Sequence, residues 1–222
     1  MSAPLEHILA DLEALVAFDT RNPPRDLTVE APLFRWLNDR VPGFTTEVLD
    51  FGDGCLGWYA RRGETETLFN VHLDTVPVAP GWTRDPFTLL KGDDRATGLG
   101  ACDIKGAAAC LLSVAEATDA PMAFLFTTDE EAGKSDAVHG FLRTDHPYNR
   151  VIVAEPTEVQ AVPQHRGIIS AEVQFSGTSG HASGGGASAV HAAAAFVTKA
   201  LGTDWAKENR LNFGRIEGGV KP

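Results

Sequence analysis

Apolar residues recur every three or four positions at the start of the chain, which predicts an amphipathic helix. They are Leu5, Ile8, Leu9, Leu12, Leu15 and Val16. A second, short helix is expected from about Pro32 to Arg40, because Val41-Pro42-Gly43 follows it. Alternating apolar and polar residues then predict strands at 44–49 and 56–60, with a Gly-Asp-Gly turn between them.

Short apolar runs alternate with helical segments in the middle of the chain. Strands buried on both faces are expected at 68–71, 123–126 and 151–154. Between them, the sequence predicts an alanine-rich helix at 104–117 and a helix that Ser135 could cap. Apolar strands separated by helices favour the α/β class, with a mainly parallel sheet covered by helices on both faces.

The pattern changes near Arg166. Residues 168–175 alternate like a strand with one exposed face, and a loop rich in glycine and serine follows. A helix at about 189–201 and a strand at 211–216 would complete a β-α-β unit. We therefore expect one domain over residues 1–165 and part of another over residues 166–222.

Composition and charge limit the number of domains and disfavour some classes of binding partner. The 222 residues, 43% of them apolar, suffice for one large or two small domains. The formal charge of −11 disfavours nucleic acid and anionic membranes as partners. Three cysteines without CxxC spacing, behind an N-terminus that does not resemble a secretory leader, favour free thiols and a cytoplasmic location.

One histidine and several carboxylates follow the predicted buried strands or precede the alanine-rich helix. They are His72, Asp74, Asp103, Glu130, Glu131 and Glu155. In open α/β sheets, ligands bind beyond the carboxyl ends of the strands. Carboxylates gathered there would repel one another. A pair of divalent cations about 3.5–4 Å apart would remove that repulsion and lower the pKa of a shared water.

Neighbouring residues can divide the tasks of such a site. Glu130 and Glu131 are adjacent on a turn, so one could bind metal while the other takes a proton from water. His72 and Asp74 face the same side of an extended strand, so Asp74 can accept the imidazole N–H. Each feature alone has an ordinary structural explanation, such as a helix cap at Asp103. Their joint placement favours a metal site.

Four segments in order, 72–77, 98–106, 129–133 and 155–157, resemble the M20 metallopeptidase family over nearly the whole chain. Residues 18–24 and 165–167 are most similar to its members that deacetylate acetylornithine or acetylcitrulline in arginine biosynthesis. The resemblance implies a zinc-peptidase-like catalytic domain, followed by the first β-α-β part of an α+β lid and dimerisation domain.

The resemblance also implies a role for each site residue. Asp103 would bridge two divalent ions, Zn²⁺ or Co²⁺, with Mn²⁺ as a third option. His72 and Glu155 would complete one ion, and Glu131 would bind the other. Glu130 would be the general base, and Asp74 would orient His72. His181 would help to stabilise the oxyanion from the lid, often across a homodimer.

The implied substrate is a small N-acyl amino acid with a linear amide bond, and acetyl is the expected acyl group. A dipeptidase or carboxypeptidase, or a succinyl-diaminopimelate desuccinylase, would use the same metals. A non-catalytic fragment or interaction module is the alternative from another class. Family members also continue beyond the length of this chain, with the second half of the catalytic domain and a further metal-binding histidine.

Overall fold

The structure is a computed structural model that describes residues 3–132, 135–164, 167–178, 180, 181, 184 and 186–219. The chain divides into two compact units, Met1–Val162 and Pro163–Pro222. This division lies close to the predicted boundary at residue 165. The catalytic and lid identities of the two units remain predictions.

A five-stranded sheet in the order β1-β2-β6-β3-β7 forms the first unit. The strands are β1 (Thr45–Asp50), β2 (Leu56–Arg62), β3 (Thr67–His72), β6 (Met122–Thr127) and β7 (Arg150–Val153). β2 is antiparallel to both β1 and β6, whereas β3 is parallel to both β6 and β7. Only β2 therefore runs against the others, and the predicted mainly parallel α/β fold is confirmed.

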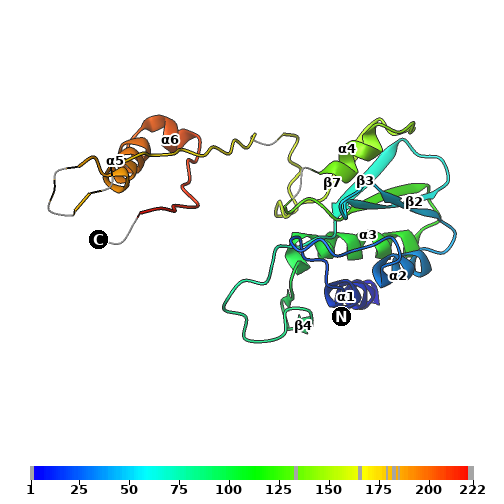
Figure 1. Cartoon of the computed structure of the whole chain (residues 1–222). Helices are drawn as coiled ribbons and strands as arrows, with labels where there is room; N and C mark the ends of the chain where they lie inside the picture. The colour runs from blue at the N-terminus through cyan, green and yellow to red at the C-terminus, as the bar shows by residue number, and fades with distance from the viewer. Residues whose placement is uncertain are drawn as a thin grey trace. The chain divides into compact units, whose positions relative to one another are not determined.

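Helices cover both faces of this sheet, as predicted (Figure 1). On one face lie α1 (Ala3–Ala17), α2 (Pro32–Arg40) and α3 (Gly106–Ala117), and on the other lies α4 (Asp136–Leu142). The sequence did not predict the small ribbon of β4 (Leu90–Lys91) and β5 (Ala96–Thr97), or the π-helical turn η1 (Ala101–Lys105).

The central strand β6 separates two hydrophobic cores. Phe124 and Phe126 pack in the larger core with residues of α1, α2 and α3. Ala123 and Leu125 point to the smaller core, which contains Phe141 of α4. Every residue of β6 is buried. An uninterrupted apolar run is typical of a strand that is covered on both faces.

The prediction that strand 151–154 is buried was wrong. β7 lies at the sheet edge and pairs only with β3. Val151, Ile152 and Val153 are 49%, 52% and 57% exposed. Within the described part of the chain, no strand pairs with the outer edge of β7. Apolar residues make a strand suited to burial, but the strand is buried only where a neighbouring strand or helix covers it.

The capping role predicted for Ser135 was also wrong, although α4 begins directly after it. Ser135 has a left-handed backbone (φ 53°) and its side chain makes no capping hydrogen bond. Asp129, two residues after β6, caps the helix instead: its Oδ2 accepts a hydrogen bond of 3.1 Å from the Ala137 N–H. A carboxylate eight residues earlier in the chain than Ala137 thus holds the start of α4.

In the second unit, the predicted helix is present as α5 (Ala189–Leu201), and a short α6 (Asp204–Glu208) follows. The predicted strands at 168–175 and 211–216 are wrong, because the described residues from 167 onward contain no strand. Ile168 and Ile169 are each 93% exposed. Alternation suits a half-buried strand, but a strand forms only where a partner accepts its backbone hydrogen bonds.

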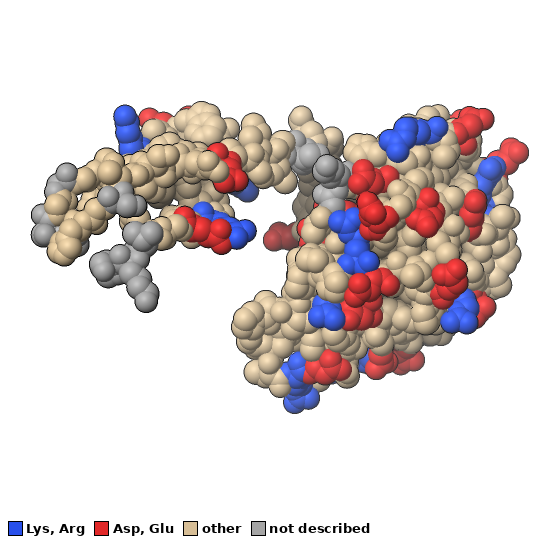
Figure 2. Space-filling model, in the orientation of Figure 1, with Lys and Arg blue, Asp and Glu red and all other residues tan. Residues whose placement is uncertain are grey.

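Two further observations concern the surface. Of the described helices, none is long and apolar enough to span a bilayer. On the face shown in Figure 2, basic side chains lie among acidic ones. The charge of −11 therefore does not make that face uniformly negative.

Candidate metal centre

Parallel pairing of β3 with β6 brings the candidate site together. His72, the last residue of β3, pairs with Thr127, the last residue of β6. The pairing continues where the Leu73 N–H donates to the Thr127 carbonyl at 2.7 Å. The segments that follow the two strands therefore leave the sheet at the same edge, as the fold predicts for a ligand site.

Three predicted ligands converge at this edge. One donor atom from each of His72, Asp103 and Glu131 lies within 4.8 Å of the others. His72 Nε2 is 3.1 Å from Asp103 Oδ1. Asp103 lies in η1 with a non-helical backbone, and its side chain is 52% exposed. One imidazole nitrogen and two carboxylates form a suitable donor set for zinc or a similar divalent ion.

Asp74 is buried behind His72. His72 Nδ1 lies 3.1 Å from the Asp74 carbonyl oxygen and 3.6 Å from Asp74 Oδ1. Asp74 Oδ2 accepts hydrogen bonds of 2.9 Å from Asn22 Nδ2 and from the Glu131 N–H. With the Nδ1 proton directed at Asp74, the Nε2 lone pair is left for a metal ion. This arrangement supports the orienting role expected of Asp74.

The charges of these groups shift their pKa values. Burial alone would lower the pKa of His72, but hydrogen bonds and the charge of Asp74, with a contribution from Glu130, raise it to about 9. Burial and the charges of Asp103, Asp74 and Glu130 raise the pKa of Glu131, although His72 opposes the shift. Without a metal ion, this edge of the sheet therefore holds excess negative charge.

The remaining predicted residues lie outside the converging group. Glu130 and Glu155 are exposed, near the start of the loops that follow β6 and β7. Burial and the charges of Asp103 and Glu130 raise the pKa of Glu155. The charges of Asp103 and Glu130, which raise the pKa of Glu131, therefore also act on Glu155. His181 belongs to the second unit, whose placement relative to the first is not determined. The roles of these three residues stay predictions.

Three residues that the sequence does not single out as site residues support the site. Asn22 Nδ2 donates to Asp74 Oδ2 at 2.9 Å. Thr20 Oγ1 donates to the Leu73 carbonyl at 2.6 Å. Lys105 is buried, its Nζ donates to the Phe18 carbonyl at 3.0 Å, and burial lowers its pKa to about 8 against the charges of Asp19 and Asp74. All three lie in segments that carry the family resemblance.

We expect His72 to titrate near pH 9 in the metal-free chain. Because a metal ion binds only the neutral ring, affinity should fall about tenfold for each pH unit below that value. NMR of labelled histidine, assigned with His72→Gln, measures the titration. Asp74→Asn removes the neighbouring charge and should move the midpoint downward. A midpoint near the ordinary value of about 6.5 in the unmodified chain would contradict this electrostatic picture.

Comparison with known proteins shows which family this chain belongs to. The sequence profile of peptidase family M20/M25/M40 matches residues 68–212. N-acetyl-L-citrulline deacetylase of Xanthomonas campestris is 47% identical over 100% of this chain and 63% of its own length. Acetylornithine deacetylase of Yersinia pseudotuberculosis is 34% identical over 71% of this chain and 46% of its own length. The chain thus spans less than two thirds of these relatives.

Solved structures show the same fold at lower sequence identity. Human carnosine dipeptidase 1 has a TM-score of 0.54 and 21% identity over 68% of this chain and 38% of its own. The di-peptidase Dug1p of Saccharomyces cerevisiae has a TM-score of 0.52 and 16% identity over 62% of this chain and 35% of its own. Since the family profile matches well over half of its residues, the chain belongs to peptidase family M20/M25/M40.

Proposed function

We propose that this chain provides the metal-binding part of a hydrolase that removes the acetyl group from N-acetylcitrulline or N-acetylornithine. The convergence of His72, Asp103 and Glu131 is the observation that carries the proposal. The substrate class rests on the 47% identity to a protein named N-acetyl-L-citrulline deacetylase. Zn²⁺ and Co²⁺ are the proposed metals, because both accept mixed nitrogen and oxygen ligands.

The proposed ligands divide between two ions. Asp103 lies within reach of both His72 and Glu131 and would bridge the pair. Glu155 would join His72 on one ion. Its pKa is raised first by burial and then by the negative charges of Asp103 and Glu130, which the ions would neutralise. When bound, such ions polarise an amide carbonyl and lower the pKa of a water molecule.

The side chains of this chain would then move the proton. Glu130 is outside the converging group and exposed, so it is available to take a proton from the attacking water. Glu130 would then deliver that proton to the amine as the amide bond breaks. Asp74 would hold the His72 ring in place throughout, through its backbone carbonyl oxygen and its buried carboxylate.

The wider setting is part of the same proposal. Deacetylation of acetylcitrulline or acetylornithine would serve arginine biosynthesis in the cytoplasm. The second unit would act as a lid and dimerisation domain, from which His181 would help to stabilise the negatively charged oxygen. This assignment rests on the resemblance of residues 177–181 to the corresponding lid segment of the family.

Acetate release measures the proposed activity. The chain is incubated with N-acetylcitrulline or N-acetylornithine and added Zn²⁺ or Co²⁺, with and without a chelator. We expect release with metal, loss of release with chelator, and recovery when the ion is restored. N-succinyl-diaminopimelate and a dipeptide serve as alternative substrates. The proposal would be refuted if the chelator did not change acetate release. It would also be refuted if metal-loaded protein released no acetate.

A further inference from the structure

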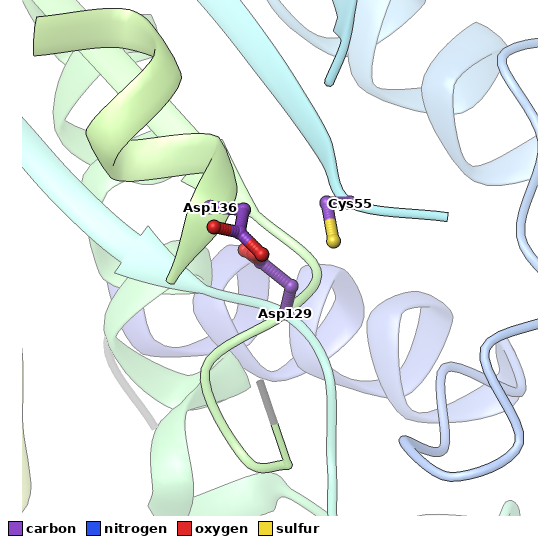
Figure 3. A group of neighbouring side chains, drawn as sticks. All are labelled: Cys55, Asp129 and Asp136. Carbon is purple, nitrogen blue, oxygen red and sulfur yellow. The ribbon is translucent and has the colours of Figure 1, made fainter. Parts of the chain in front are cut away.

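A second group of metal-ligating side chains lies outside the site described above. One donor atom from each of Cys55, Asp129 and Asp136 lies within 4.8 Å of the others (Figure 3). Cys55 directly precedes β2, Asp129 follows β6, and Asp136 begins α4. Neither Cys55 nor Asp136 belongs to a segment that carries the family resemblance, and Asp129 has no assigned role in the reaction.

Strand register explains why two of these residues meet. β2 and β6 are antiparallel, with Gly57 opposite Thr127. The pairing continues beyond the strands, where the Thr128 N–H donates to the Leu56 carbonyl at 3.1 Å. Extending that register by one further residue places Cys55 opposite Asp129. Asp136 is the first residue of α4, and Asp129 fixes the start of this helix by accepting a hydrogen bond from the Ala137 N–H.

Asp129 has an unsatisfied oxygen in this group. The residue is fully buried, and its Oδ2 accepts from the Ala137 N–H. Its Oδ1 is also buried and has no hydrogen-bond partner among the residues that the structure describes. A buried carboxylate oxygen without a partner is unfavourable, and such atoms are rare in folded proteins. A cation held between Asp129, Cys55 and Asp136 would satisfy this oxygen.

The local charge also favours a cation. Arg25 is a positive group at the site, and its Nη1 donates to Cys55 Sγ at 3.0 Å. One guanidinium does not balance the two carboxylates of Asp129 and Asp136. Burial, together with the charge of Asp129, raises the pKa of the Cys55 thiol. The thiol is therefore protonated without metal, and binding would release that proton to solvent as the sulfur–metal bond forms.

We propose that Cys55, Asp129 and Asp136 form a second binding site for a divalent ion of the zinc and cobalt class. A thiolate and two carboxylates leave one of four positions for water. The thiolate selects against magnesium and calcium, which prefer oxygen ligands. Cys55 and Asp129 are buried while Asp136 is exposed, so an ion can enter from the Asp136 side.

Cobalt binding provides a test that does not depend on the proposed deacetylase activity. In the double variant Cys102→Ser/Cys110→Ser, Cys55 is the sole thiol, and both replaced cysteines are exposed. Titrating Co²⁺ into this metal-free variant should produce a sulfur-to-cobalt charge-transfer band in the near ultraviolet. The His72 site supplies only nitrogen and oxygen ligands, so it cannot contribute such a band.

Two further variants and one control variant locate the ion. Cys55→Ser should lose the band while keeping the circular dichroism of the folded chain. In Asp136→Asn, the Co²⁺ concentration that gives half of the maximal band intensity should rise at least about tenfold. In the control Asp119→Asn, at an exposed carboxylate elsewhere, this concentration should not change. Absence of the band in the double variant at saturating Co²⁺, or an undiminished band in Cys55→Ser, would overturn the proposal.

Discussion

Replacing Glu130 by Gln is expected to lower the kcat of the proposed deacetylation by about 10²–10⁴-fold. The amide keeps the shape of the side chain but cannot take a proton from water. Metal content should not change, because Glu130 is not among the converging donor atoms. Acetate release and metal analysis on the same preparation measure the two quantities separately.

Two control variants sharpen this result. Glu131→Gln should lower metal content as well as activity, because Glu131 is one of the converging ligands. Glu64→Gln, at an exposed carboxylate elsewhere, should leave both unchanged. If Glu130→Gln keeps most of the activity, the base is another group. If Glu130→Gln loses metal, then Glu130 is a ligand and the roles of the adjacent pair are reversed.

Replacing Arg40 by Met is expected to lower the free energy of unfolding by about 3 kcal/mol. Arg40 ends α2 and makes a two-point ion pair with the buried Asp11 of α1, at 2.6 and 3.0 Å. It also contacts Glu116 of α3 at 2.7 Å. One guanidinium therefore joins three helices, and its removal leaves Asp11 buried without a partner. Urea denaturation followed by circular dichroism measures the change.

Arg95→Met is the matched control, because Arg95 pairs with Asp94 where both side chains are largely exposed. An exposed ion pair contributes only about 0–1 kcal/mol to the free energy of unfolding. Adding Asp11→Asn to Arg40→Met should recover part of the loss, because the unpaired buried charge is then removed. A loss from Arg40→Met no larger than that from Arg95→Met would show that Asp11 does not depend on this ion pair.

The prediction of secondary structure succeeded where local periodicity decides it. The spacing of Leu5 to Val16 marked α1, and the uninterrupted apolar run at 123–126 marked a central strand. Prediction failed where burial depends on a partner. β7 and residues 168–175 both have sequences suited to strands, yet the first is an exposed edge and the second pairs with nothing in the described part of the chain.

Sequence order alone determined that a histidine and carboxylates follow the strands, and that four segments match one family. It did so because strand ends and motif spacing are properties of the linear chain. Tertiary structure alone decided that Asp129 holds α4, that Asn22 supports Asp74 and that Cys55 meets two carboxylates. The contacts of Asn22 and Cys55 join residues far apart in sequence, and the contact of Asp129 depends on where α4 packs. Only strand pairing and helix packing could therefore bring these residues together.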